Sequence, residues 1–139
     1  MILIHGAYGA GKSTLAFTAP GPRLVLDSEG GAGFIEGKTL LWDPTSEELP
    51  GGIDKDTSVI VDIVDWATYR ATIDYIIACS HPFESVILDS FTEIQKQLKD
   101  VINPMKGFGD YEKATYSVWD QLLVYMEKDI RKLRDLSRP

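Results

Sequence analysis

Eight residues near the beginning of the sequence constrain the fold more than any other feature. Residues 6–13 read Gly-Ala-Tyr-Gly-Ala-Gly-Lys-Ser, a complete G-x-x-x-x-G-K-[ST] phosphate-binding loop, or Walker A motif. An apolar, strand-like run (2–5) precedes the loop, and a helix-compatible stretch (13–17) follows it. In that setting the glycines let successive backbone N–H groups point at phosphate oxygens, and the helix N-terminus adds its positive end. The motif predicts a nucleoside-triphosphate site, with ATP and Mg²⁺ as ligands.

The motif also assigns roles to individual side chains. Lys12 is expected to reach the β- and γ-phosphates and to assist catalysis, and the hydroxyl of Ser13 is expected to bind Mg²⁺. A glycine-rich turn without any ligand is the alternative, and the complete set of fixed positions disfavours it. The residues predicted to bind the nucleotide are Gly6, Ala7, Tyr8, Gly9, Ala10, Gly11, Lys12, Ser13 and Thr14.

The bulk composition places the chain among ordinary globular proteins. Its 139 residues, 44% hydrophobic and 25% charged, predict a single domain (1–139). No apolar run is long enough to span a membrane, and the loop at Gly6 leaves no room for a signal peptide. The single cysteine, Cys79, follows an apolar run and is expected to be a buried thiol in a reducing, cytoplasmic compartment.

Strand-like and helix-like segments alternate along the chain. Strands are expected at 23–27, 39–42, 59–61 and 85–89, each of them apolar on both faces. Helices are expected from Asp65 to about 80, from Ser90 to 102, and in a long final segment after a loop at 103–109. Because strands that are buried on both faces belong to parallel sheets, the predicted class is α/β, a P-loop NTPase domain with helices flanking a parallel sheet.

Two acidic residues follow predicted strands and are candidates for chemistry. Asp89 ends the strand 85–89, where a P-loop enzyme places the Walker B acid of the Mg²⁺ site; a helix-initiating acid is the alternative. Ser90 and Glu93 form an S-x-x-E capping box, so Ser90 is assigned to capping. Hydrolysis also needs a carboxylate to orient or deprotonate water. Glu29, two residues after Asp27, is the best candidate, with a surface acid in a turn as its alternative and Glu93 as a weaker rival.

The segments 27–31 (D-S-E-G-G) and 86–92 (V-I-L-D-S-F-T) resemble those of RecA-like recombination ATPases. The similarity is greatest to short phage-encoded RecA-like, AAA-type ATPases of the single-strand-annealing or recombination-mediator group. This resemblance implies that Glu29 is the catalytic base, that Asp89 binds the metal, and that the protein acts in DNA recombination or replication in a bacterial or phage-infected host cytoplasm. It also implies a homo-oligomer. RecA-like cores continue with further strands after the last helix, so the sheet is expected to be incomplete at the C-terminus.

Charge and composition suggest where a nucleic acid would bind. Residues 1–95 carry five basic and 14 acidic side chains, whereas residues 96–139 carry nine basic and seven acidic ones. A DNA backbone should therefore meet the later part of the chain. The expected contact for single-stranded DNA is the loop Asn103 to Gly109, through Lys106 and Phe108. An ordinary connection between two helices is the alternative.

Two other functions remain open from the sequence. A small-molecule or nucleotide kinase also begins with a P-loop, but such kinases usually carry an arginine-rich lid, and the arginines here lie mostly in the last helix. A nucleotide-binding module that does not hydrolyse ATP is the other alternative.

Overall fold

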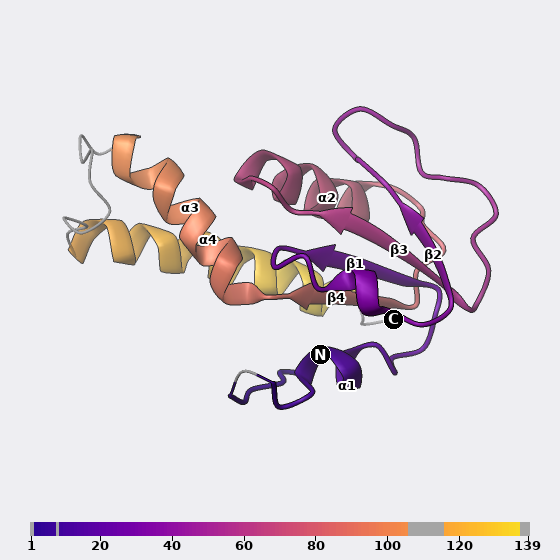
Figure 1. Cartoon of the computed structure of the whole chain (residues 1–139). Coiled ribbons are helices and arrows are strands. Elements are labelled where there is room, and N and C mark those ends of the chain that lie inside the picture. Colours follow the sequence, from indigo (N-terminus) through magenta and orange to yellow (C-terminus); the bar gives the residue numbers. More distant parts are fainter. Residues whose placement is uncertain (1, 8, 106–115, 137–139) are drawn as a thin grey trace.

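The computed structural model describes residues 2–7, 9–105 and 116–136. At its centre lies a parallel four-stranded sheet in the order β2-β3-β1-β4 (Figure 1). Helices follow the strands along the chain, so the predicted α/β class is confirmed. The strands are β1 (Arg23–Asp27), β2 (Lys38–Leu41), β3 (Thr57–Asp62) and β4 (Ser85–Asp89). The helices are α1 (Lys12–Ala16), the short 3-10 helix η1 (Ala32–Phe34), α2 (Trp66–Ala78), α3 (Phe91–Met105) and α4 (Tyr116–Leu136).

Apolar side chains cover both faces of the sheet, but unequally. The larger core packs one face against α2, α3 and α4, and it includes Leu24, Val59, Tyr69 and Ile94. The smaller core lies on the other face, where Val25 and other strand residues meet α1 and the segment around η1. Figure 1 shows α1 on the side of the sheet opposite α2. Alternate residues of β1 therefore serve the two cores, as the period of two in a strand requires.

The helices α3 and α4 form an antiparallel hairpin that projects beyond the carboxyl ends of the strands (Figure 1). One stripe of each helix is buried in the contact between them. The buried residues are Ile94, Leu98 and Ile102 on α3, and Val118, Leu122 and Met126 on α4. This spacing of three and four residues matches the apolar pattern that predicted both helices. No described helix is long and apolar enough to cross a membrane.

The first predicted strand is wrong. Residues 2–5 are not part of the sheet, and the side chains of Ile2 and Leu3 are 87% and 88% exposed. A strand needs a neighbour for its backbone N–H and C=O groups, and none of the described strands lies beside this segment. The segment instead runs below the sheet together with α1 (Figure 1). The apolar composition of residues 2–5 therefore does not predict that they pair with another strand.

Two smaller predictions are also corrected. Cys79 is exposed, because it lies at the C-terminal cap of α2, past the last residue of that helix that faces the core. The predicted loop 103–109 is partly helical, because α3 continues through Asn103 to Met105. Asn103 itself is buried. The expected edge of an incomplete sheet stays a prediction; β2 and β4 are the outer strands of the sheet described here.

Candidate functional site

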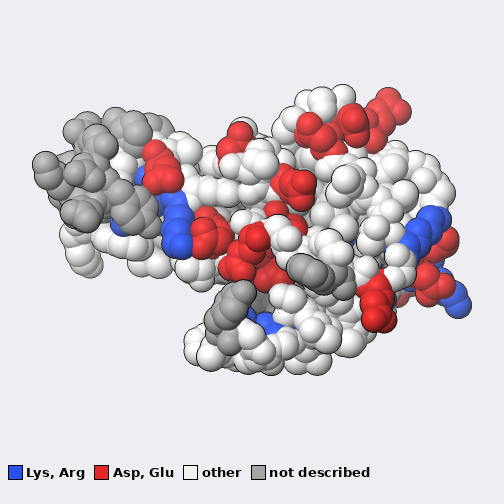
Figure 2. Space-filling model, in the orientation of Figure 1, with Lys and Arg blue, Asp and Glu red and all other residues white. Residues whose placement is uncertain are grey.

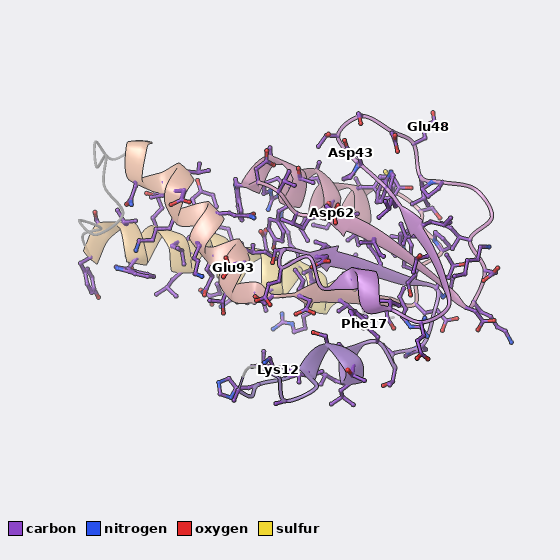
Figure 3. All side chains as sticks on the ribbon, viewed as in Figure 1. Lys12, Phe17, Asp43, Glu48, Asp62 and Glu93 are labelled. Atoms are coloured by element: carbon purple, nitrogen blue, oxygen red, sulfur yellow. The ribbon has the colours of Figure 1, made fainter. Side chains whose placement is uncertain are left out.

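The carboxyl ends of β1 and β4 bring two predicted site residues to the same edge of the sheet. In the parallel pairing of these strands, Asp27 lies opposite Asp89. Glu29 follows Asp27 by two residues, so it emerges next to the end of β4. The phosphate loop reaches the same edge from below. Figure 3 shows Lys12 on the segment under the sheet and Glu93 at the base of α3.

A direct contact links the phosphate loop to β4. The Ser13 hydroxyl donates a hydrogen bond of 2.5 Å to Asp89 Oδ2. These are the two side chains that the sequence predicts as metal ligands, and they are separated by 76 positions in the chain. Both offer hard oxygen donors, which are the atoms that Mg²⁺ prefers.

The phosphate loop is curled as its glycines permit. Gly9 and Gly11 have φ angles of +77° and +79°, a left-handed backbone conformation that residues other than glycine rarely adopt. The Lys12 ammonium donates to the carbonyl oxygens of Gly6 at 3.0 Å and Ala7 at 2.9 Å. The lysine side chain therefore folds back over its own loop, and its ammonium is hydrogen-bonded to uncharged carbonyl groups there. Thr14 is exposed on α1, and Tyr8 lies outside the described residues.

A buried carboxylate fixes the loop that carries Glu29. Asp27 is only 4% exposed, and its two oxygens accept hydrogen bonds from four successive backbone N–H groups, of residues 29, 30, 31 and 32, at 2.7–3.2 Å. Its backbone carbonyl accepts a further bond from Ile63, 2.8 Å away. A carboxylate saturated in this way holds the chain in one tight turn. Asp27 therefore fixes the position of the backbone that carries Glu29.

Two serines complete the connection between β1 and β4. The Glu29 carboxylate accepts a 2.5 Å hydrogen bond from the Ser90 hydroxyl. The Ser28 hydroxyl accepts from the Ser90 backbone N–H at 2.9 Å, and the Ser28 backbone N–H donates to the Asp89 carbonyl at 2.7 Å. Glu29 is thus tied to Ser90, the residue next to Asp89, and Asp89 in turn contacts Ser13 of the phosphate loop.

One comparison with known proteins assigns the chain to a family. The family model of an AAA domain matches residues 1–138. The chain belongs to this AAA domain family. Neither the curated proteins nor the solved structures that were compared give a match. The family identifies a P-loop ATPase-like domain that binds nucleotide, and the parallel sheet flanked by helices is consistent with it.

Ser90 in this AAA domain does not have the role that its sequence context predicts. The S-x-x-E pattern predicts that Ser90 caps α3, but its hydroxyl bonds to Glu29. Glu93 pairs with Lys96, one turn further along α3, and so does not complete a capping box. The physical reason is that the hydroxyl donates to a charged acceptor within its reach, and this hydrogen bond, stronger than one between neutral groups, sets the orientation of the Ser90 side chain.

Sequence reasoning also overlooked Asp27 and Ser28 as parts of the site. A signal for Asp27 was available, since an aspartate followed by Ser-Glu-Gly-Gly can accept hydrogen bonds from the backbone N–H groups of a tight turn. No local pattern identifies Ser28, because its partners come from β4. The predicted DNA contact at Lys106 and Phe108 lies outside the described residues, as does most of the loop that carries it.

The charge around the site is strongly negative. Figure 2 shows acidic side chains spread over the middle of the visible face of the molecule. Asp43 comes two residues after β2, and Asp62 is the last residue of β3; both are exposed (Figure 3). Hydrogen bonds from the side chain and backbone of Thr45 and from Ser46 lower the pKa of Asp43, so it stays ionised. A polyphosphate entering here needs Lys12 and a divalent cation to offset the repulsion.

Proposed function

We propose that this AAA domain binds ATP with Mg²⁺ through residues 6–14 and hydrolyses it to ADP and phosphate. The observation that supports this most directly is the contact between Ser13 and Asp89, 2.5 Å apart. It joins the last residue of the Walker A motif to the acid at the end of β4. A glycine-rich turn without function would not need this partner.

The metal would be held by residues whose chemistry fits it. The Ser13 hydroxyl and the Asp89 carboxylate offer two oxygen donors, and Mg²⁺ typically takes one or two protein ligands and completes its shell with water and phosphate oxygens. When bound, Mg²⁺ supplies positive charge that neutralises the charge developing on the phosphates.

Lys12 is the residue of the loop that would bind the terminal phosphates. Among the described residues, its ammonium donates hydrogen bonds to the carbonyl oxygens of Gly6 and Ala7, which are uncharged. Hydrogen bonds between two charged groups are about twice as strong as those with a neutral partner. A phosphate oxygen would therefore displace these carbonyls, and Lys12 would gain stronger bonds without leaving the loop.

Glu29 is proposed as the general base. Its carboxylate would accept a proton from a water molecule as the oxygen of that water bonds to the γ-phosphorus. The bond from the γ-phosphorus to the bridging oxygen breaks in the same displacement, and ADP leaves with that oxygen. Ser90 donates to one oxygen of Glu29, so the other oxygen stays available for the water. The hydrogen bonds on Asp27 hold the loop still during this step.

The biological setting is proposed from the resemblance to RecA-like ATPases. We infer a role in phage-type DNA recombination or replication, with single-stranded DNA as a partner and with several copies of the chain working together. A kinase is less consistent with the described arginines near the C-terminus. Arg131 pairs with Glu127 and Arg134 with Asp135, all on α4, and so they are engaged away from the phosphate loop.

Two measurements on the same preparation test the proposal. Isothermal titration with ATP and Mg²⁺ should show binding that Lys12→Ala weakens strongly. Phosphate release should occur in wild type and should be lost in Glu29→Gln, with binding kept. Formation of ADP without free phosphate, with the phosphoryl group transferred to an added acceptor alcohol, would identify a kinase. ATP binding without any phosphate release would identify a non-hydrolysing module and refute the proposed hydrolysis.

A further inference from the structure

A cavity lies between α2 and α4, and none of its lining residues belongs to the phosphate loop. Its volume is about 280 Å³. It combines aromatic rings with cationic side chains, which is an unusual lining for a chain with a net charge of −7. The lining residues are Trp66, Arg70, Tyr125, Lys128, Asp129 and Lys132.

The walls of this cavity are held rigidly by a buried ion pair. Arg70 Nη1 contacts Asp129 Oδ1 at 2.6 Å, and the Asp129 side chain is only 4% exposed. This pair ties α2 to α4. Asp65 caps the N-terminus of α2 by accepting from the backbone N–H of Thr68 at 2.8 Å, so the first residue of that helix, Trp66, is fixed as well. A site that is already ordered loses less entropy when it binds a ligand.

The cations of the cavity are of two kinds. Arg70 is neutralised by Asp129 and also contacts the exposed Asp74 at 2.7 Å. Lys128 and Lys132, one helical turn apart on α4, have no ion pair with any described residue. The other acidic residues beside them, Glu127 and Asp135, are paired with Arg131 and Arg134. The positive charge of the two lysines is therefore available to an anion.

The aromatic residues complete the chemistry. The Tyr125 ring is 41% exposed, so part of its surface is open to a ligand. Trp66 is half-buried; it stacks on Tyr69 with a centroid distance of 4.8 Å and lies under the Arg70 guanidinium. An exposed ring beside two unpaired lysines is the combination that binds a flexible polyanion with flat bases, since every base has a face that can stack.

We propose that the cavity between α2 and α4 binds single-stranded DNA, with Tyr125 stacking on a base and with Lys128 and Lys132 holding the adjacent phosphates. The partner is taken from the proposed function, on which the inference rests in this respect only. The site is separate from the loop at 103–109. It places the strand on α2 and α4, and the acidic side chains of residues 1–95 limit how far the strand can extend toward the sheet.

Fluorescence anisotropy with a labelled dT₂₀ oligonucleotide at low salt tests this site. Tyr125→Leu should weaken binding by about 5-fold or more, whereas Tyr125→Phe, which keeps the ring, should bind as wild type does. Lys128→Gln/Lys132→Gln should lower the slope of log K against log salt by about 1.4, because each lost phosphate contact on a single strand contributes about 0.7. Arg131→Gln/Arg134→Gln makes the same change of charge on the same helix outside the cavity, and should lower the slope by less.

Two outcomes would overturn the inference. One is an oligonucleotide affinity that Tyr125→Leu and the double lysine variant leave unchanged; the other is a wild-type protein that does not bind the oligonucleotide at all. ATP affinity is measured on every variant. Lost DNA binding with unchanged ATP affinity supports the cavity as the DNA site, and wild-type protein that binds the oligonucleotide but not ATP would refute the proposed ATPase and leave the cavity site standing.

Discussion

The two halves of the proposed nucleotide site differ sharply in how they are held. On the sheet side, Asp27, Ser28 and Ser90 form a network of hydrogen bonds that fixes Glu29 next to Asp89. On the loop side, residues 2–7 are mostly exposed, and the contact that joins the motif to β4 is the bond from Ser13. The half proposed to be catalytic is anchored to the sheet through the buried Asp27, although Glu29 itself is exposed, whereas the half proposed to bind phosphate is mostly exposed.

This difference indicates which half of the site loses conformational entropy when a ligand binds. The sheet side has already lost its conformational entropy on folding, so it can position a water molecule without further cost. The described residues of the loop side are mostly exposed, and we expect a bound ligand to restrict them further. Its packing on the sheet relies on the small core that includes Phe17 (Figure 3) and Ala19. We therefore expect variants of the two halves to separate into effects on turnover and effects on affinity.

The largest expected effect is on the sheet side. Glu29→Gln should slow phosphate release by about 10²- to 10⁴-fold, the usual contribution of a general base, and should leave ATP affinity within a factor of about two. The measurement is single-turnover phosphate release alongside isothermal titration. Glu93→Gln is the matched control on α3. If the control loses activity and Glu29→Gln does not, the base has been assigned to the wrong strand end.

The next effect tests the loop side. Lys12→Ala should weaken ATP binding by about 10- to 100-fold, because a hydrogen bond to a charged group is worth about 1.5–3 kcal/mol. The folded structure should be unaffected, since the lysine bonds only to carbonyls of its own loop. Titration with ATP and a thermal melt without ATP measure the two properties. A lower melting temperature without nucleotide would show that the loop is more firmly part of the fold than its exposure indicates.

Asp27→Asn tests the rigidity of the sheet side. The amide keeps one acceptor oxygen and turns an NH₂ group toward backbone N–H groups, so the free energy of unfolding should fall by about 1–3 kcal/mol. Urea denaturation of the chain measures it. Asp43→Asn, which also loses hydrogen bonds to a turn but on an exposed residue, should cost less. Equal losses in the two variants would remove the distinction between a buried clamp and an ordinary turn.

The smallest effect concerns Ser90. Ser90→Ala removes one hydrogen bond to Glu29 and should lower kcat by about 3- to 10-fold with KM unchanged. Ser90→Thr keeps the hydroxyl and should restore part of the loss, which a purely structural defect would not allow. Ser80→Ala, at an exposed serine after α2, is the control. An increase in KM without a change in kcat would place Ser90 on the binding side of the comparison.

Much of the fold could be predicted because its signals are local. The four described strands carry apolar runs that end in recognisable breaks, and the helices α2, α3 and α4 show apolar residues at spacings of three and four. Asp65, read as the start of α2, does cap it. These features depend on neighbours within one or two turns, which a single sequence contains.

The failures concern relations between distant segments. Residues 2–5 have the composition of a strand, but composition does not show whether an edge strand of the sheet pairs with them. Ser90 has the right spacing for a capping box, but its actual partner, Glu29, lies 61 positions away. Asp89 and Ser13 do lie in contact, as is expected of two residues that share one ligand, and their role in binding a metal stays a prediction. The cavity between α2 and α4 has no motif at all.

The hairpin of α3 and α4 begins next to the proposed nucleotide site. The helix α3 begins directly after Ser90, and Gln97 braces it through a 2.8 Å hydrogen bond to the carbonyl of Ile63. Its 15 residues span about 22 Å at about 1.5 Å per residue. A tilt of about 10° at its root would move its far end by about 4 Å, given that length. If α3 moved as a rigid body about its root beside Ser90, a sub-ångström rearrangement around the phosphates would become a displacement several times larger at the far end of the helix.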